Sequence, residues 1–237
     1  MQGYRADQAQ HVLFRHRRLR RGGTRHYVGH VSSKTVVAAT EDGRRPRQEE
    51  TFRKLVVAAL DTLRESSYAD LTVRAVASRA QVAPATAYTY FSSKNHLVAE
   101  VYLDLVRQVP FFTDVNDTRL NRVQQAVRSL ALVVADEPEV AAACTTALLS
   151  NDNAVGAVRD RIGAEIHQRI KSALGPDGDA RTVAACEMSY FGALVQAGSG
   201  AFTYRQIADR LGYVVSLILD GNAEQDAEQA AEQDGHD

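Results

Sequence analysis

Residues 71–98 constrain the fold of this chain more than any other stretch. Small apolar residues recur in its first half with the spacing of one helical face. These residues are Val73, Val76, Ala77 and Ala80. Residues 81–83 break the pattern, and Pro84 supplies the fixed φ that suits the first position of a new helix. Two helices joined by a tight turn, with the second one polar, are typical of a motif that enters the DNA major groove.

The same stretch resembles the helix-turn-helix signature of the TetR family of bacterial transcriptional regulators. That signature is roughly T-[VI]-x-x-[IV]-A-x-x-A-G-V-S-x-x-T-[LIV]-Y-x-[YH]-F-x-x-K-x-x-L. The matching residues are Thr72, Val73, Val76, Ala77, Ala80, Val82, Thr86, Tyr88, Tyr90, Phe91, Lys94 and Leu97. Gln81 replaces the usual turn glycine, Ala83 replaces a capping serine, and Ala87 replaces a larger apolar residue. The resemblance implies a DNA-binding regulator with a variant motif.

The two changes in the turn lower the expected local stability. Loss of a side-chain cap at Ala83 costs on the order of 1 kcal/mol. Gln81 must adopt a backbone angle that glycine adopts more easily. Because tertiary packing holds so short a helix more than its own propensity does, we expect the same fold.

The resemblance also implies which side chains contact DNA. The expected contacts are Arg47, Thr72, Arg74, Pro84, Ala85, Thr86, Tyr88, Thr89, Tyr90 and Lys94. Ala85 offers a methyl contact to thymine, and Thr89 can hydrogen-bond or meet the same methyl group. Lys94 begins the next helix, where a cation and unbonded N–H groups together suit a phosphate. Packing is the alternative role for Tyr88, and a solvated surface position is the alternative for Arg74.

The chain before and after this motif is also helical in pattern. Apolar residues in 47–66 follow the spacing of an amphipathic helix. They are Phe52, Leu55, Val56, Ala59, Leu60 and Leu63. Further apolar stripes continue to residue 221, with no strand-like alternation after residue 47. The predicted fold class is all-α: a helix-turn-helix DNA-binding domain over residues 47–92, then a helical regulatory and dimerisation domain over residues 93–221.

Composition narrows the class of protein further. Apolar residues make up 45% and charged residues 24%, as in globular soluble proteins. No apolar run approaches the roughly 18 residues that cross a bilayer, and the N-terminus lacks a secretory pattern, so we expect a cytoplasmic protein without a membrane partner. Cys144 and Cys186 are expected to be buried reduced thiols rather than a disulfide or metal site.

A net charge of −1 hides a strong asymmetry between the two ends of the chain. Residues 1–47 contain eleven Lys or Arg and three acidic residues, whereas residues 222–237 contain six acidic residues and no Lys or Arg. We interpret residues 1–46 as a basic disordered extension and residues 222–237 as an acidic disordered tail. The extension is an arm that contacts phosphates or the minor groove, a solvated tail, or the product of an over-long start.

The resemblance implies a ligand pocket and a dimer interface in the second domain. Pocket candidates are Phe111, Phe112, Cys144, Leu148, His167, Met188 and Phe191. Dimer-face candidates are Leu194, Val195, Leu211, Val215 and Ile218. Simple core packing is the alternative for each of these residues. The pocket candidates are largely apolar, so the sequence favours a small hydrophobic effector. His96 is expected to be an exposed histidine without a partner.

These features favour a ligand-responsive repressor that acts as a homodimer on a near-palindromic operator in double-stranded DNA. The sequence contains no phosphate-binding loop, no H-E-x-x-H and no cysteine cluster, so neither an enzyme, nor a metal, nor a cofactor is expected. The alternative is a helical dimeric interaction protein whose altered turn has weakened or abolished DNA binding.

Deletion of residues 1–40 tests whether the basic extension contacts DNA. Each phosphate that a protein neutralises releases counterions, so a contacting arm steepens the salt dependence of affinity. Because this segment has no regular pattern, we expect the deletion to leave the salt slope of operator affinity unchanged. Fluorescence anisotropy at several salt concentrations measures that slope, and a shallower slope after deletion would show that the arm contacts DNA.

Overall fold

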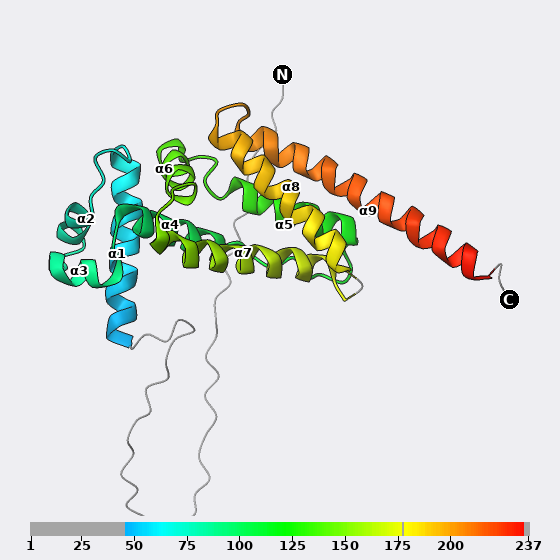
Figure 1. Cartoon of the computed structure of the whole chain (residues 1–237), viewed down its shortest axis with the longest axis horizontal. Coiled ribbons are helices and arrows are strands. Elements are labelled where there is room, and N and C mark those ends of the chain that lie inside the picture. The colour runs from blue at the N-terminus through cyan, green and yellow to red at the C-terminus, as the bar shows by residue number, and fades with distance from the viewer. Residues whose placement is uncertain (1–45, 177, 235–237) are drawn as a thin grey trace, which may run out of the picture. The chain divides into compact units, whose positions relative to one another are not determined.

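The computed structural model describes residues 46–234 except residue 177, with side chains described up to residue 221. Within that part of the chain every regular element is a helix, which confirms the all-α fold class (Figure 1). The helices are α1 (Pro46–Glu65), α2 (Val73–Arg79), α3 (Pro84–Tyr90), α4 (Lys94–Arg107), α5 (Arg119–Leu132), α6 (Pro138–Leu148), α7 (Asn153–Leu174), α8 (Ala180–Gly198) and α9 (Tyr204–Asp234). The basic extension predicted for residues 1–46 lies outside the described residues except for Pro46.

Helix α1 is amphipathic, as its spacing predicts, and its apolar side faces α2 and α4. Its buried residues are Phe52, Leu55, Val56, Ala58, Ala59 and Leu63. Helix α2 begins after Thr72, whose hydroxyl accepts a hydrogen bond from the Ala75 N–H at 3.0 Å. Thr72 is therefore the N-cap of α2. The two short helices α2 and α3 contact each other, and α2 packs on α1, so a three-helix unit forms.

The turn between α2 and α3 carries the backbone cost that the sequence predicts. Gln81 has a φ of 56°, in the left-handed region that glycine adopts most easily. Ala83 precedes α3 without a side-chain cap, and Pro84 occupies the first turn. The Val82 N–H donates to the Ala77 carbonyl at 2.9 Å, which closes the turn through the backbone. Backbone closure and burial thus hold a turn that lacks both glycine and a cap.

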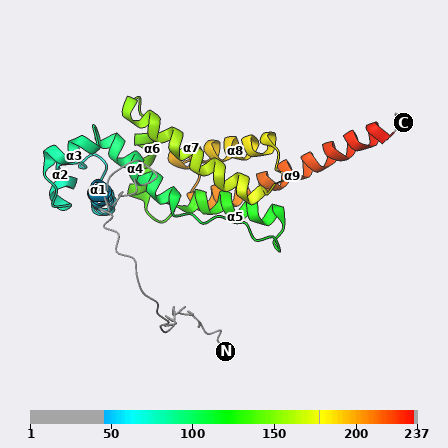
Figure 2. The same ribbon diagram turned by 90° about the horizontal axis from the view of Figure 1, so that it is seen from below.

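Helix α4 belongs to both parts of the fold, because it contacts α1 on one side and α6 and α7 on another (Figure 2). Nine of its residues are buried: Leu97, Val98, Ala99, Glu100, Val101, Tyr102, Leu103, Leu105 and Val106. Ser93 caps this helix by accepting from the His96 N–H at 3.0 Å. A helix buried on so many sides cannot shift without moving its neighbours.

Helices α4 and α7 are also tied together by polar contacts at both ends. At the start of both helices, the Ser93 hydroxyl donates to Asp152, which is itself the N-cap of α7. At the far end, Arg169 is almost fully buried and donates to the carbonyl oxygens of Arg107 and Val109, each at 2.9 Å. These bonds satisfy carbonyl groups that the end of α4 leaves unpaired.

Helices α5 to α9 form the second part, in which α9 contacts α5 and α8. Helix α5 ends at Leu132, and Pro138 opens α6. Proline fits a first helical turn because its missing N–H has no partner there. Helix α7 is capped at its C-terminal end by Gly175, whose φ of 84° is one that glycine adopts easily. Thr203 and Gln206 form a capping box at the start of α9, since the Thr203 N–H donates to Gln206 Oε1 at 2.9 Å.

The acidic disordered tail predicted from residue 222 is wrong for most of its length. Helix α9 continues to Asp234, and only residues 235–237 lie beyond the described backbone. Residues 222–234 are mainly Ala, Glu and Gln, which are strong helix formers. The prediction weighed charge and low hydrophobicity and neglected that propensity.

Replacement of Gln81 by glycine is expected to stabilise the protein. Removing the strain of a left-handed φ raises the free energy of unfolding by about 1–2 kcal/mol. The greater freedom of glycine in the unfolded chain lowers it by about 0.5–1 kcal/mol. We expect Gln81→Gly to raise the free energy of unfolding by about 0.5–1 kcal/mol in urea titrations. The control is Ala80→Gly at a φ of −75°, which should lower it by a similar amount. A Gln81→Gly variant that is less stable than the unaltered protein would show that the Gln81 backbone is not strained.

Candidate DNA-contacting surface and ligand cavity

Helix α3 presents nearly all of its side chains to solvent. Ala87 is its one buried residue and holds the helix against the core. Five of its residues, all expected to contact DNA, are exposed: Pro84, Ala85, Thr86, Tyr88 and Thr89. Tyr88 is 54% exposed, so the packing role that remained open for it is not supported. A short helix with one small anchor and a polar outer face is suited to entering a groove.

An aromatic cluster fixes the C-terminal end of α3. Phe52 of α1 stacks on Phe91 with ring centroids 5.2 Å apart, and Tyr90 lies 6.3 Å from both rings. Tyr90 is therefore half-buried, with its ring committed to packing. Of the residues expected to contact DNA, it is the one whose ring serves structure most clearly.

Lys94 is held in place by Tyr68 in the turn that follows α1. Its Nζ donates to the Tyr68 carbonyl at 3.1 Å and lies 4.2 Å from the centroid of the Tyr68 ring. The Tyr68 hydroxyl in turn donates to Asn95 of α4. The ammonium group is thereby positioned at the start of α4, close to the end of α3.

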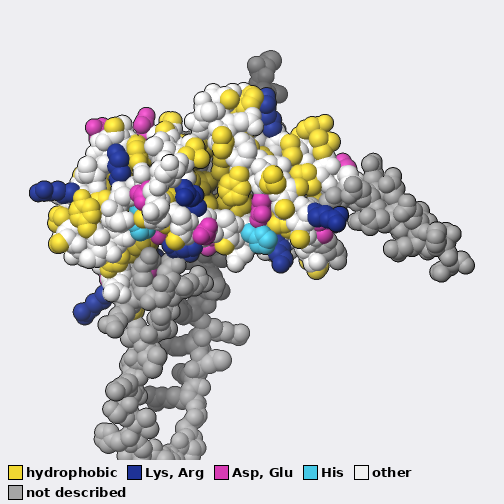
Figure 3. Space-filling view, in the orientation of Figure 1, with side chains coloured by type: hydrophobic (Ala, Val, Ile, Leu, Met, Phe, Trp, Pro, Cys, Tyr) yellow, Lys and Arg dark blue, Asp and Glu magenta, His cyan; other side chains and the backbone are white. Residues whose placement is uncertain are grey.

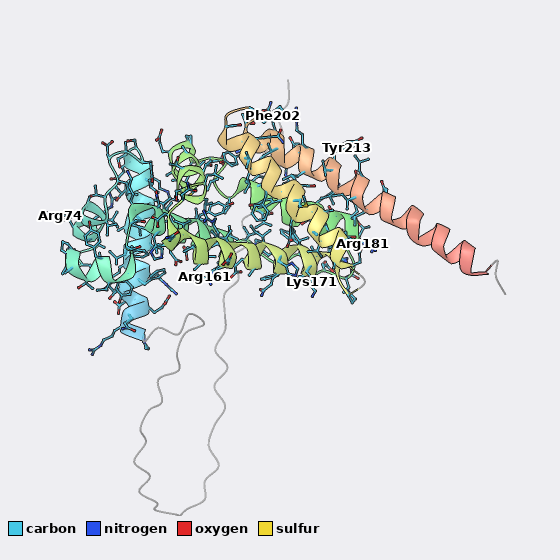
Figure 4. The ribbon with its side chains drawn as sticks, in the orientation of Figure 1. Arg74, Arg161, Lys171, Arg181, Phe202 and Tyr213 are labelled. Atoms are coloured by element: carbon cyan, nitrogen blue, oxygen red, sulfur yellow. The ribbon has the colours of Figure 1, made fainter. Side chains whose placement is uncertain are left out.

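The remaining expected contacts lie on exposed positions. Thr72, Arg74 and Arg47 are all exposed, and Arg74 projects away from α2 (Figure 4). Arg79 differs, because its guanidinium pairs with both Glu65 oxygens at 2.5 and 2.6 Å. The structure thus places eight of the ten expected contacts on α2, α3 and the residue before α2, while Lys94 begins α4 and Arg47 lies at the start of α1.

The expectation of an exposed, unpartnered His96 is wrong. The His96 ring makes an edge contact with Phe91 at 5.6 Å, and its Nε2 lies 3.8 Å from Glu100. Glu100 is buried and also receives the Arg161 guanidinium at 2.7 Å. Burial would raise the pKa of Glu100, but His96 and Arg161 together hold it below its usual value. Sequence spacing missed this group because Arg161 comes from α7.

A second ion pair joins the three-helix unit α1–α3 to the helices that follow. Arg64 near the end of α1 donates from Nε and Nη2 to the two Glu137 oxygens, at 2.6 and 2.8 Å. Glu137 immediately precedes α6. The Arg64 hydrogen bond holds the pKa of Glu137 below its usual value. Helices α1 and α6 are therefore coupled by a two-point ion pair.

An apolar cavity of about 330 Å³ opens between α6, α7 and α8, where hydrophobic side chains gather in a hollow (Figure 3). Its lining residues are Tyr102, Val134, Cys144, Thr145, Leu148, Leu149, Arg159, Ile162, Phe191, Leu194, Val195 and Tyr204. The volume lies at the small end of the range for ligand pockets. A wider groove along α1 is lined partly by acidic residues, which suit neither an apolar ligand nor a phosphate.

Three of the seven predicted pocket residues line this cavity, namely Cys144, Leu148 and Phe191. Phe111, Phe112, His167 and Met188 are not among its lining residues. The Phe111 ring lies under the Arg169 guanidinium at 4.7 Å, His167 pairs with Glu187 at 2.9 Å, and Met188 is 76% exposed. These four residues lie on or near the helices that form the cavity, but their side chains do not line it.

Sequence reasoning missed the most polar parts of the cavity. Tyr102 of α4 lies among apolar stripe residues, so its spacing predicts only packing. In the structure its hydroxyl lies 3.0 Å from the Tyr190 hydroxyl, which donates to the Leu130 carbonyl at 3.3 Å. Burial raises the pKa of both phenols, so both remain neutral. No signal in one sequence pairs Tyr102 with Tyr190, 88 residues away.

The predicted dimer-face residues divide into two groups. Leu211 and Val215 are buried within the chain on the side of α9 that packs inward, so they are not available to a second copy. Leu194, Val195 and Ile218 are half-buried or exposed. Among the described side chains of α8 and α9, the most exposed large apolar residues are Met188, Val195, Tyr213 and Leu217, and of these only Val195 belongs to the predicted dimer face. The helical stripe was identified correctly, but its inward and outward sides were not distinguished.

Both cysteines are buried and free, as expected. Burial raises the pKa of Cys144 to about 12 and that of Cys186 to about 11. Such thiols stay protonated and unreactive. Among the described residues, no group of three or more His, Cys, Asp and Glu is arranged to hold a metal ion, and no helix there is long and apolar enough to cross a membrane.

The elements around α3 define a helix-turn-helix DNA-binding protein, and comparisons with known proteins specify it further. The model of the bacterial regulatory proteins of the tetR family matches residues 55–101. An HTH-type transcriptional regulator of Mycobacterium tuberculosis is 72% identical over 180 residues, covering 75% of this chain and 84% of that protein. The chain belongs to the TetR family of HTH-type transcriptional regulators, which is a non-enzymatic family.

More distant relatives extend the comparison. The HTH-type transcriptional repressor KstR of Rhodococcus jostii is 28% identical over 199 residues, covering 79% of this chain and 92% of that protein. A TetR regulator of Rhodococcus sp. RHA1 superimposes with a TM-score of 0.61 at 20% identity, covering 70% of this chain and 96% of that chain. At that identity the structural likeness shows the fold alone.

The Arg64–Glu137 pair provides a test of the contact between α1 and α6. Both side chains are partly exposed, so we expect Glu137→Ala to lower the free energy of unfolding by no more than about 1 kcal/mol, and by less in high salt. Urea unfolding at two salt concentrations measures both effects. The matched control is Asp136→Ala, which breaks the more exposed pair with Arg205 and should change stability less. Equal losses of unfolding free energy in the two variants would contradict the coupling of α1 to α6 through the Arg64–Glu137 pair.

Proposed function

We propose that the protein is a ligand-responsive repressor that binds a near-palindromic operator as a homodimer. The observation that carries this proposal is the exposed polar face of α3, anchored by Ala87 and the Phe52–Phe91 stack. This helix is attached to α4, which is buried along its length against α7. Helix α3 is thus joined through the buried helix α4 to a cavity of a size that can hold a ligand, and this arrangement suits a ligand-responsive regulator.

The DNA-contacting residues have distinct proposed roles. Tyr88 and Thr89 lie on the exposed face of α3 and are proposed to read base edges, with Ala85 offering a methyl contact to thymine. Thr72, Thr86 and Lys94 are proposed to contact phosphates. The Tyr90 ring supports α3, which leaves its hydroxyl as the part that can meet a phosphate. Pro84 sets the start of the helix, and Arg47 and Arg74 add positive charge.

Dimerisation is proposed to use the outer sides of α8 and α9. Met188 and Val195 lie two turns apart on α8, where Val195 also borders the cavity, and Tyr213 and Leu217 lie one turn apart on α9. All four are more than half exposed, and Tyr213 projects outward from α9 (Figure 4). A two-fold dimer uses the same patch on both copies. Such a dimer would present two copies of α3 about 34 Å apart, one turn of DNA.

The effector is proposed to occupy the cavity between α6, α7 and α8. Tyr102 places α4 in the cavity wall, so a ligand there contacts the helix that leads to α3. A ligand that prefers one position of α4 shifts the population between DNA-binding and released states. A difference in binding of a few kcal/mol between the two states is sufficient.

A mobility-shift assay with the DNA upstream of the protein's own gene tests DNA binding. We expect retardation at low salt, because phosphate contacts supply much of the affinity. Lys94→Ala should weaken binding to all sequences and reduce the salt slope by about one. Tyr88→Ala should weaken binding more selectively, by about 1–3 kcal/mol. Lys171→Ala, an exposed lysine near the end of α7, is the matched control and should leave binding unchanged.

The alternative, a helical interaction protein without DNA binding, rests on the strained turn at Gln81 and the missing cap at Ala83. It predicts a folded dimer that retards no DNA at low salt. Gel filtration with light scattering establishes the dimer in the same preparation. Lack of retardation by that dimer would overturn the repressor proposal.

A further inference from the structure

The geometry points to the chemical class of the effector: an apolar chain with a hydroxyl group at its buried end and a carboxylate at the mouth of the cavity. This inference rests on the proposed function, because it assumes that the cavity between α6, α7 and α8 is the effector site. It follows from two of the four polar residues in the lining, Tyr102 on the floor and Arg159 on the rim.

The floor of the cavity is set by Tyr102, which is 3% exposed, with Cys144 and Ile162 equally buried beside it. The Tyr102 hydroxyl bonds to the Tyr190 hydroxyl, and Tyr190 bonds to the Leu130 carbonyl. A carbonyl oxygen only accepts hydrogen bonds, so the single hydroxyl proton of Tyr190 is used in its bond to Leu130. Tyr102 must therefore donate to Tyr190.

This direction decides what Tyr102 can offer a ligand. With its proton committed to Tyr190, the Tyr102 oxygen keeps lone pairs but no donor. A ligand that meets it with a hydroxyl forms a hydrogen bond, whereas a ligand that presents a ketone or aldehyde oxygen places acceptor against acceptor. Polar groups left unpaired in a buried site cost about 1–3 kcal/mol. The floor thus selects a hydrogen-bond donor.

The rim of the cavity instead offers a ligand hydrogen-bond donors and a positive charge. Arg159 is exposed at the cavity border, and its Nη1 donates to the Leu148 and Ser150 carbonyls at 2.9 and 3.0 Å. These two bonds fix the guanidinium at the end of α6 and leave the N–H groups on Nε and Nη2 for a ligand. A planar guanidinium with remaining donors is suited to a carboxylate.

The walls between these two groups are apolar except for the hydroxyls of Thr145 and Tyr204, which are hydrogen-bonded to each other. They include Leu148, Phe191, Leu194 and Val195. A cavity of about 330 Å³ corresponds to roughly ten water-sized volumes at about 30 Å³ each, which suits a chain of medium length. Together the donor-selective floor, apolar walls and cationic rim match an ω-hydroxy carboxylic acid in shape and polarity.

Three matched compounds test this class by calorimetric titration of the full-length protein. They are ω-hydroxydecanoic acid, decanoic acid and methyl ω-hydroxydecanoate. We expect the hydroxy acid to bind tightest. Loss of the hydroxyl should weaken binding about fivefold, the factor for a hydrogen bond of about 1 kcal/mol. Loss of the charge should weaken it about tenfold or more, because charged hydrogen bonds are stronger.

Variants of the lining residues assign each preference to its side chain. Tyr102→Phe should abolish the preference for the hydroxy acid over decanoic acid, and Arg159→Gln should abolish the preference for acid over ester. Arg181→Gln, at the start of α8 and outside the cavity lining, is the control and should retain both preferences. Tyr190→Phe frees the Tyr102 proton, so it should shift preference toward ω-oxodecanoic acid. If either cavity variant fails to fold, the compound series on the unaltered protein still decides.

The possible failures are distinguishable from one another. Equal binding of decanoic acid and the hydroxy acid overturns the assignment of the floor, and equal binding of acid and ester overturns the assignment of the rim. Lack of binding by all three compounds overturns the ligand class. Each of these results is obtained on protein that retards operator DNA, whereas protein that retards no DNA overturns the proposed function instead.

Discussion

The burial of α4 on several sides is the constraint on which the rest of this structure depends. Its N-cap Ser93 is bonded to Asp152, the N-cap of α7, and its last carbonyls are bonded by the buried Arg169. Because interiors are packed as densely as crystals, such a helix moves with its neighbours rather than alone. The helix that follows the DNA-contacting motif is therefore also part of the cavity wall. The DNA-contacting motif and the cavity therefore share one rigid element.

The DNA-contacting part shows how packing replaces local signals. The turn lacks the glycine and the capping serine of the family signature, yet α3 forms where expected. Ala87, the Phe52–Phe91 stack and the Lys94–Tyr68 contact hold its two ends. The free energy lost at Gln81 and Ala83 is about 2–3 kcal/mol in total, which is similar to what the burial of one aromatic side chain contributes.

Local patterns predicted the helices, whereas contacts between residues far apart in the chain could not be predicted from them. The caps at Thr72 and Thr203 involve residues three apart, so the sequence carries their full signal. Tyr102 with Tyr190, and Glu100 with Arg161, involve residues far apart in the chain, and a helical stripe identifies neither partner. The same limit explains Leu211 and Val215, since periodicity marks a helical face without saying whether it meets its own chain or a second copy.

Hydrogen–deuterium exchange with and without a retarded DNA fragment tests the central claim most directly, because it reports the two ends of α4 together. The account predicts slower exchange in residues 72–94, from DNA contact, and in α4 and the first turn of α7, which are bonded through Ser93 and Asp152. Exchange that is unchanged in residues 72–94 would contradict the DNA-contacting role of α3. Protection confined to those residues, with α4 and α7 unaffected, would contradict a rigid link to the cavity.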